Sequence, residues 1–255
     1  MLLVVDIGNT HVSIGVYSQR ELVGSCRISS NTTRTEDETW FILHSLFESQ
    51  GLSFDDITGG AISSVVPNQT PVFEQLCIRK LDIKPVVVSS EIKTNMKILY
   101  RDPASVGPDR ICNAIAGFTK FGGPLIIVDF GTATTFDVVS EQGEYLGGII
   151  APGLESSSYV LHQHAARLPK VELKFPKSVI GKTTEESMQA GIMFGTVDLV
   201  RGLIVRINDE LQVSARLIIT GGIGSRISGK FQDWNPEVEP NLTLEGLRIL
   251  HEINI

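Results

Sequence analysis

Val5-Asp6-Ile7-Gly8-Asn9-Thr10 is repeated in nearly the same form as Val128-Asp129-Phe130-Gly131-Thr132-Ala133, close to half the chain further on. Each copy ends an apolar run and precedes alternating apolar residues, the pattern of a buried strand that turns back into a second strand. In such a turn the glycine lets backbone N–H groups approach phosphate oxygens, and the Asn or Thr side chain adds a donor. The aspartate at the strand end can hold a hydrated cation. Two facing copies predict a nucleotide cleft.

The composition is that of an ordinary globular protein. The chain has 255 residues, 42% hydrophobic and 20% charged, enough for one large domain or two smaller ones. The net charge of −7 disfavours binding to nucleic acid, which depends on Lys and Arg neutralising phosphates. We therefore expect any phosphate ligand to be held by backbone donors and a metal ion.

Nothing in the sequence predicts a membrane or secreted protein. No apolar run approaches the ~20 residues that span a bilayer. The first ten residues, MLLVVDIGNT, lack the basic segment of a signal peptide. Cys26, Cys77 and Cys112 have neither metal-ligand nor disulfide spacing, which is typical of reduced thiols. These features predict a cytoplasmic protein without a membrane partner.

The first half of the chain predicts a β-hairpin followed by alternating helices and strands. Leu2–Asp6 is expected to be a strand that turns at Gly8–Thr10 into a second strand, whereas a dinucleotide-binding fold would enter a helix through Gly-x-Gly-x-x-Gly. A P-loop is absent from the sequence. The capping box Thr35–Glu38 opens a helix, and Ala61–Val66 and Pro85–Val88 are further buried strands.

The second half restarts this pattern. Leu125–Asp129 and Phe136–Val139 predict a second hairpin, and a capping box at Thr183–Glu186 opens a helix through about Leu211. Close packing against the other half or another subunit is expected at three glycines of that helix, Gly191, Gly195 and Gly202. We expect an α/β fold of two similar halves, 1–117 and 118–255. Each is a mixed sheet that begins with a β-hairpin and is flanked by helices, with the nucleotide cleft between them.

Asp109 is the candidate proton acceptor. It follows Gly107 and Pro108 at the start of a predicted helix, where the positive end of the helix dipole would keep it ionised and make it a weak base. Phosphoryl transfer tolerates a weak base, although an aspartate that only caps a helix is very common. Arg110 is interpreted either as a clamp for a carboxylate or phosphate or as a surface residue. Tyr100 fits either packing or substrate contact.

Two further motifs indicate a functional site less specifically. Thr220-Gly221-Gly222 follows a predicted strand and could let a base or ribose lie against bare backbone, but such a pair is also a common turn. His162 and His164 are two residues apart on a predicted helix, where their rings would point in different directions. We interpret them as non-ligands.

With these motifs in their observed order, the chain resembles the type III pantothenate kinases of the acetate and sugar kinase, chaperone and actin superfamily. The resemblance covers nearly the whole length. It is carried by the two aspartate turns and by five further motifs: Gly107-x-Asp109-Arg110, Gly147-Gly148 with Pro152-Gly153, Gly181-Lys182-Thr183-Thr184, Met188-Gln189-x-Gly191 and Thr220-Gly221-Gly222. Pro108 departs from the small residue often found there, and Asn95-Met96 replace an expected glycine-containing stretch.

The resemblance implies two ribonuclease H-like halves and ATP-dependent phosphorylation of pantothenate to 4'-phosphopantothenate, the first step towards coenzyme A. It implies Asp109 as the proton acceptor and Asp129 as the ligand of K⁺ or NH₄⁺, with Mg²⁺ held at Asp6 through water. The implied ATP contacts are Asp6, Ile7, Gly8, Asn9, Thr10, His11, Val12, Ser13 and Thr132. The implied pantothenate contacts are Tyr100, Gly107, Pro108, Asp109, Arg110 and Thr184. Members of this family are homodimers.

Two alternatives remain open from the residues alone. Another small-molecule kinase of the same superfamily would share the ATP motifs and differ at the acceptor pocket. A non-catalytic, nucleotide-binding transcriptional accessory protein is the alternative from another class. The negative charge argues against direct contact with DNA, and a module without catalysis would be expected to lack the acidic residue Asp109.

Overall fold

The structure is a computed structural model that describes residues 1–89, 91–165 and 167–255. These residues form two compact units, Met1–Phe121 with Asn241–Ile255, and Gly122–Pro240. The last helix therefore packs with the first unit, whereas the sequence division grouped residues 118–255 together. The functional roles that we assigned to 1–117 and 118–255 stay predictions. Each unit is described by itself.

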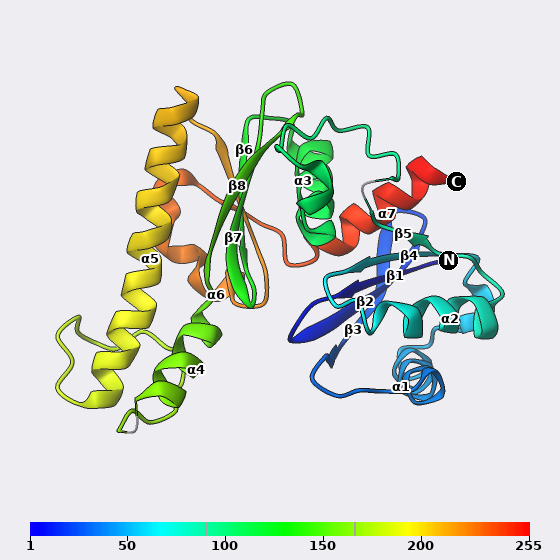
Figure 1. Cartoon of the computed structure of the whole chain (residues 1–255), viewed down its shortest axis with the longest axis horizontal. Coiled ribbons are helices and arrows are strands. Elements are labelled where there is room, and N and C mark those ends of the chain that lie inside the picture. Colours follow the sequence, from blue (N-terminus) through cyan, green and yellow to red (C-terminus); the bar gives the residue numbers. More distant parts are fainter. Residues whose placement is uncertain (90, 166) are drawn as a thin grey trace. The chain divides into compact units, whose positions relative to one another are not determined.

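The first unit is built on a mixed five-stranded sheet in the order β3-β2-β1-β4-β5. Strands β1, β2 and β3 are antiparallel neighbours, whereas β1, β4 and β5 run parallel (Figure 1). Its strands are β1 (Leu2–Ile7), β2 (His11–Ser18), β3 (Glu21–Ser29), β4 (Gly59–Ser64) and β5 (Val86–Val87). Its helices are α1 (Glu36–Glu48), α2 (Thr70–Leu81), α3 (Pro108–Phe121) and α7 (Leu242–Asn254), with short 3-10 turns at Phe54–Asp56 and Pro103–Ser105.

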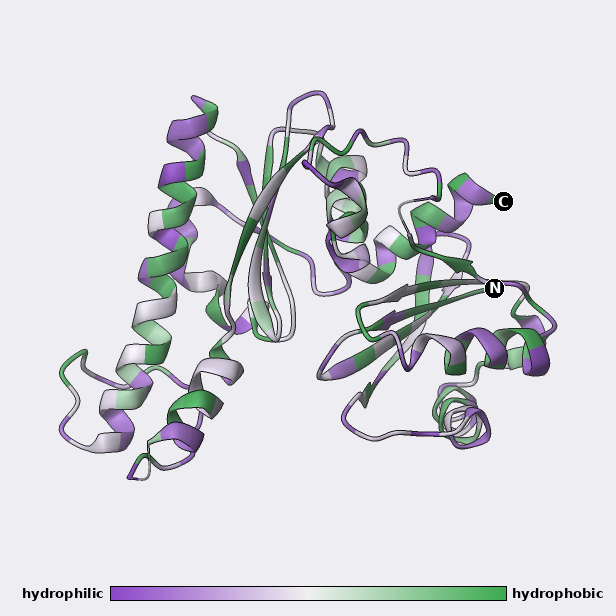
Figure 2. Cartoon of the chain, in the orientation of Figure 1, coloured by the Kyte–Doolittle hydropathy of each residue, from purple (hydrophilic) through white to green (hydrophobic). Residues whose placement is uncertain are grey.

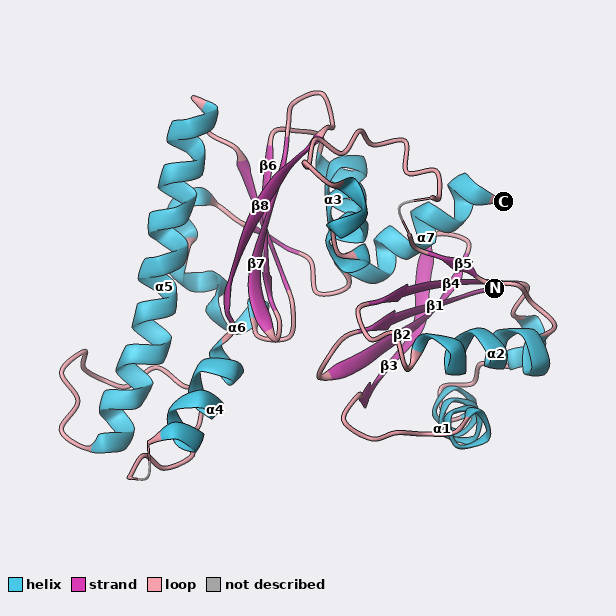
Figure 3. Cartoon of the chain, in the orientation of Figure 1, coloured by secondary structure: helices cyan, strands magenta, loops and turns pink. Residues whose placement is uncertain are grey.

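The second unit repeats this sheet, in the order β10-β9-β6-β7-β8. Strands β6, β7 and β8 are antiparallel, and β6, β9 and β10 are parallel (Figure 3). Its strands are β6 (Leu125–Phe130), β7 (Ala133–Val139), β8 (Tyr145–Pro152), β9 (Arg216–Thr220) and β10 (Glu237–Val238). Its helices are α4 (Leu154–His164), α5 (Thr184–Leu211) and α6 (Gly224–Ile227), and 3-10 turns follow at Ser228–Lys230 and Gln232–Trp234. The prediction of two similar halves, each beginning with a hairpin, is confirmed.

Each sheet has a hydrophobic core on one face, and in the first unit α7 also packs against β1 and β4, and α3 against β4. In the first unit Leu3, Val5 and Ile7 of β1 join a core that includes Leu43 of α1 and Leu76 of α2. In the second unit alternate residues of β6 pack into a core with α5, along which hydrophobic and hydrophilic residues alternate (Figure 2). Because side chains alternate along a strand, Asp6 and Asp129 lie on the opposite faces of their sheets from these cores.

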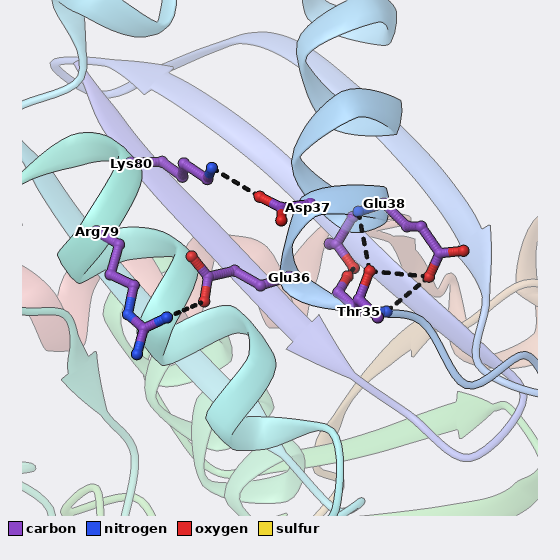
Figure 4. A network of polar contacts seen from close by, with 7 residues as sticks. Thr35, Glu36, Asp37, Glu38, Arg79 and Lys80 are labelled. Carbon is purple, nitrogen blue, oxygen red and sulfur yellow. Dashed lines mark hydrogen bonds and ion pairs between the residues drawn. The ribbon is translucent and has the colours of Figure 1, made fainter.

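The capping box at the start of α1 forms as predicted. The Thr35 N–H donates to the Glu38 carboxylate at 2.8 Å, and the Glu38 N–H donates to the Thr35 hydroxyl at 3.3 Å (Figure 4). Asp37 and Glu36 in the same turn pair with Lys80 and Arg79 of α2, at 2.7 and 3.5 Å. These contacts fix α1 against α2 on one side of the sheet.

The second capping box forms only in part. The Thr183 hydroxyl accepts the Glu186 N–H at 3.1 Å, as the pattern requires. The Glu186 carboxylate, however, accepts the N–H of Lys182 at 2.8 Å and not that of Thr183. The hydrogen bond from the Glu186 side chain at the start of α5 therefore reaches one residue further upstream than the sequence predicts.

Candidate active site

The first aspartate turn joins β1 to β2. Asp6 is paired with Ser13 and Ile7 with Val12, so residues 8–11 make the turn. The Gly8 N–H donates to the His11 carbonyl at 3.0 Å, which closes the turn. The predicted ATP contacts Asp6 to Ser13 therefore form one hairpin end.

Ser30 holds this turn from outside the hairpin. Its hydroxyl donates to the Gly8 carbonyl at 2.6 Å, and its N–H donates to the Thr10 carbonyl at 2.9 Å. Ser30 directly follows β3 and is 7% exposed. The polar end of the hairpin is thus fixed by two hydrogen bonds from a buried residue.

Asp109 is the second residue of α3, as its sequence position predicts. Its Oδ1 accepts the Arg110 N–H at 2.9 Å. Burial raises the pKa of the Asp109 carboxyl above its usual value, and the Arg110 N–H and charge offset only part of this shift. The expectation that the helix start makes Asp109 a weak base is wrong in sign, because burial outweighs the helix terminus.

The start of α3 is shaped around this carboxylate. A Cβ at Gly107 would lie 2.5 Å from the Asp109 Oδ1, so the glycine leaves room for the carboxylate. Pro108 is the first helical residue, where proline is favoured. Arg110 is 6% exposed, so its interpretation as a surface residue is wrong. Tyr100, in the segment before α3, is 36% exposed.

Cys112 and Ser63 are two residues of this region that the sequence analysis missed. Cys112 lies one turn after Asp109 and is fully buried. Burial holds the pKa of its thiol well above the usual value, and the charges of Asp6 and Asp109 raise it further. Both carboxylates therefore act on one thiol.

Ser63 is paired with Asp6 across β1 and β4 and is also fully buried. The sequence could have indicated Cys112, because it is three residues after Asp109 on a predicted helix. The place of Ser63 beside Asp6 could be found only from the pairing of β1 with β4.

The second aspartate turn joins β6 to β7 and is one residue shorter. Phe130 is paired with Thr134, which leaves residues 131–133 in the turn, and the Gly131 N–H donates to the Ala133 carbonyl at 3.1 Å. The start of α4 holds it: the Ser156 hydroxyl and the Gly153 N–H donate to the Thr132 carbonyl at 2.6 and 3.2 Å. Thr132 is therefore placed in a fixed turn, as its predicted role requires.

Asp129 lies against bare backbone. It is paired with Thr220 across β6 and β9, and Gly221 follows with φ +90°. A Cβ at Gly221 would lie 2.4 Å from the Asp129 Oδ1, so this glycine makes room for Asp129. The nucleoside contact predicted for Gly221 stays a prediction.

Asp129 and the paired Thr220 place a carboxylate and a hydroxyl on neighbouring strands, and oxygen ligands of this kind fit a hard cation. Within residues 1–89, 91–165 and 167–255, no cluster of three or more His, Cys, Asp or Glu could hold a metal ion. A cation here would therefore draw on backbone, hydroxyl, water or substrate oxygens beside the single carboxylate. Asp6, partly exposed at the end of β1, likewise fits a hydrated ion.

Thr184 lies at the start of α5. It is the exposed first residue of α5, in a turn where hydrogen bonds join Lys182, Thr183 and Glu186. Its predicted contact with pantothenate stays a prediction.

No helix among the residues that the structure describes is long and apolar enough to cross a membrane.

Solved structures share this fold at low sequence identity. A protein from Campylobacter jejuni assigned to the Baf family of transcriptional activators matches with a TM-score of 0.62 and 18% identity, covering 98% of this chain and 97% of its own. The activator of 2-hydroxyisocaproyl-CoA dehydratase from Clostridium difficile, with bound ADPNP, matches with a TM-score of 0.60 and 16% identity over 98% and 93%. These likenesses define the class of fold, two mixed five-stranded sheets that each begin with a β-hairpin.

Comparison with known sequences shows the family to which the chain belongs. The family model for type III pantothenate kinase matches residues 2–206. Type III pantothenate kinases of Geotalea daltonii and Geobacter sulfurreducens are each 47% identical over 254 residues, covering 100% of this chain and 99% of each relative. The chain belongs to the type III pantothenate kinase family. Its predicted enzyme class, a kinase that acts on an alcohol group, is confirmed by this membership.

Proposed function

We propose that the chain phosphorylates pantothenate to 4'-phosphopantothenate with ATP, the first step towards coenzyme A, and that Asp109 accepts the proton of the attacking hydroxyl. The observation that carries the assignment of the base is the place of Asp109 in the first unit. It stands at the start of α3 with a raised pKa, and its charge acts on the same buried thiol as that of Asp6, at the end of the hairpin.

The raised pKa suits this role. A carboxylate that binds a proton more strongly is a better general base, provided that it is still ionised at the working pH. Phosphoryl transfer passes through a loose transition state, so the base mainly orients the hydroxyl and takes its proton late. Burial around Asp109 and the Arg110 N–H hold the carboxylate in one place, which supports orientation.

The two aspartate turns are proposed to have different partners. Backbone and side-chain donors of Gly8, Asn9 and Thr10 would contact the ATP phosphates, and Asp6 would hold Mg²⁺ through water. Thr132 would contact ATP, and Asp129 would hold K⁺ or NH₄⁺ beside Thr220. When bound, the cations would supply positive charge that stabilises the transferring phosphoryl group.

The acceptor pocket in the first unit is proposed to comprise Tyr100 and Gly107 to Arg110. Tyr100 precedes α3 and is partly exposed, so its ring remains accessible to a small molecule. Arg110 places a buried positive charge close to Asp109, where an anionic group of either substrate would be attracted.

A homodimer is proposed from the surface of α5. A Cβ at Gly191, Gly195 or Gly202 would meet no other atom within 4 Å, so these glycines are not explained by packing within the chain. Leu199 and Val205 on the same helix are 40% and 48% exposed. A second copy that packs against this smooth face would offset the low helix propensity of the glycines.

We also propose that the enzyme works in the cytoplasm. Its substrate ATP is made there, and Cys26, Cys77 and Cys112 are all free. The proposal includes no nucleic-acid or membrane partner.

The test of the base is Asp109→Asn in a coupled ADP-release assay with pantothenate and a panel of sugars and acids. Turnover should fall about 10²–10⁴-fold because the general base is lost, while ATP binding is kept. Asp37→Asn is the matched control, since Asp37 is also the second residue of a helix and pairs with Lys80 at the surface. Near-normal turnover in Asp109→Asn would remove Asp109 as the base. A sugar preferred over pantothenate would overturn the substrate.

A further inference from the structure

Helix α7, at the end of the chain, packs against the elements that carry the proposed acceptor site in the first unit. It contacts α3, which carries Asp109, and the strands β1 and β4, which carry Asp6 and Ser63. In Figure 1 the first turns of α7 lie beside α3. The C-terminal helix is therefore in contact with the same elements that carry Asp6, Ser63 and Asp109.

The contact between α7 and α3 is unusually close. A Cβ at Gly246 would lie 2.2 Å from the Cys112 carbonyl oxygen and 2.7 Å from its Cα, so the two helix backbones meet at Cys112. One turn earlier on α7, the Thr243 hydroxyl donates to the Asn113 Oδ1 at 2.8 Å, and Asn113 is 1% exposed. The turn of α3 that follows Asp109 is therefore held by α7.

The other end of α7 holds the segment that leads to α3. The Lys93 N–H donates to the Asn254 Oδ1 at 3.0 Å, and the Asn254 Nδ2 donates to the Lys93 carbonyl at 2.9 Å. One amide side chain thus satisfies both backbone groups of Lys93, as a neighbouring strand would. Asn254 Nδ2 also donates to the Leu250 carbonyl at 2.8 Å, which fixes the amide on its own helix.

The segment between Lys93 and Gly107 has little regular structure of its own. Its helical content is the 3-10 turn Pro103–Ser105, and Met96 and Val106 are its buried apolar side chains. Tyr100 lies between them. The bridge at Ile98 and the cap at Asp102 hold this segment further along, and Lys93 is the attachment at its start, ahead of Tyr100.

We propose that α7 positions the acceptor substrate site, and that Asn254 is a positioning residue for the segment that carries Tyr100 and Gly107. This rests on the proposed roles of Tyr100, Gly107 and Asp109. The two ends of α7 have separable effects: Asn254 sets where pantothenate is held, whereas Gly246 and Thr243 set where the base stands. A small displacement of either group lowers the rate, because orientation supplies much of the rate enhancement.

The test is steady-state kinetics of Asn254→Ala and Asn254→Asp in the full chain, with Ile255→Ala as control. Asn254→Ala should raise the KM for pantothenate about five- to tenfold and leave the KM for ATP within about twofold, because two hydrogen bonds to Lys93 are lost. Asn254→Asp keeps the acceptor for the Lys93 N–H and should recover part of the loss. Ile255 is 83% exposed, so its replacement should change neither constant.

Thr243→Val tests the other end of α7. It should lower kcat about threefold with little change in either KM, because it releases α3 and not the preceding segment. Assays well below the melting temperature separate these effects from unfolding. An unchanged KM for pantothenate in Asn254→Ala, or an equal rise in both KM values, would overturn the proposal. The assignment of Asp109 as the base is tested separately, because normal turnover of Asp109→Asn would refute it whatever the Asn254 variants show.

Discussion

Asp6 and Asp129 occupy equivalent places in two sheets of the same strand order, and their neighbours differ. On the adjacent parallel strand, Asp6 is paired with the buried Ser63 and Asp129 with the buried Thr220. After Thr220 the chain enters a left-handed glycine, Gly221, whose backbone lies against the Asp129 carboxylate. Cys112 lies where the charge of Asp6 acts on it. One aspartate is lined by backbone, and the other belongs to a region that contains a second carboxylate, Asp109.

This difference suggests how a duplicated motif acquires two functions. A carboxylate against bare backbone suits a cation with few other charged ligands, because carbonyl and hydroxyl oxygens complete the coordination. A carboxylate near a second, half-buried carboxylate suits phosphoryl transfer, because one can serve the metal and phosphates while the other serves the hydroxyl. The turns themselves are alike, and their surroundings separate them.

The largest expected effect concerns Gly221. Gly221→Ala would place a methyl group 2.4 Å from the Asp129 Oδ1 at a φ of +90°, so both overpacking and backbone strain oppose it. We expect a loss of about 2–4 kcal/mol in the free energy of unfolding. Denaturant unfolding measures it. Gly229→Ala is the control, because a Cβ there meets no atom within 4 Å. Equal stability of the two variants would refute the close approach at Asp129.

Ser30 and Ser156 make a matched pair for the two turns, since each hydroxyl donates at 2.6 Å to a turn carbonyl, of Gly8 and of Thr132. Ser30→Ala should raise the KM for ATP about fivefold, because the phosphate-binding hairpin end is loosened. Ser156→Ala should mainly raise the K⁺ concentration that gives half-maximal activity. Titrations of ATP and of K⁺ on both variants measure these effects. Identical profiles would mean that the turns do not differ in function.

The smallest expected effect is on the pH dependence of stability. The folded protein binds a proton at Asp109 more strongly than the unfolded chain, so the ionised form lowers stability above the raised pKa. Asp109→Asn should therefore raise the melting temperature by a few degrees at pH 8. The gain should shrink as the pH falls through the raised pKa towards the ordinary carboxyl range. Thermal melts at several pH values measure this, and a variant less stable than the parent at pH 8 would contradict it.

Much of the fold follows from local sequence. Both hairpins were predictable because apolar residues alternate within each strand, and the capping box of α1 because its two residues are three positions apart. Repetition of the aspartate turn then predicted two similar sheets, since the same local pattern builds the same element twice.

What the sequence missed depends on long-range packing. Ser63 is brought beside Asp6 by the parallel pairing of β1 with β4, and α3 brings Cys112 under the charge of both carboxylates. The pKa of Asp109 was misjudged because a local argument, the helix terminus, competes with burial set by the whole unit. The nucleoside contact of Gly221 stays a prediction, and the sequence did not indicate that its missing side chain also makes room for Asp129.

The most direct test of the two-function account is the ratio of turnover in K⁺ to turnover in Na⁺ for the parent enzyme, Asp6→Asn and Asp129→Asn. Asp6→Asn should lose turnover in both salts, by about 10²-fold or more, and keep the parent ratio, because its carboxylate serves Mg²⁺ and phosphate. Asp129→Asn should lose the preference for K⁺, so that its ratio approaches one. Loss of the ratio in Asp6→Asn, or its retention in Asp129→Asn, would contradict the assignment of different functions to the two turns.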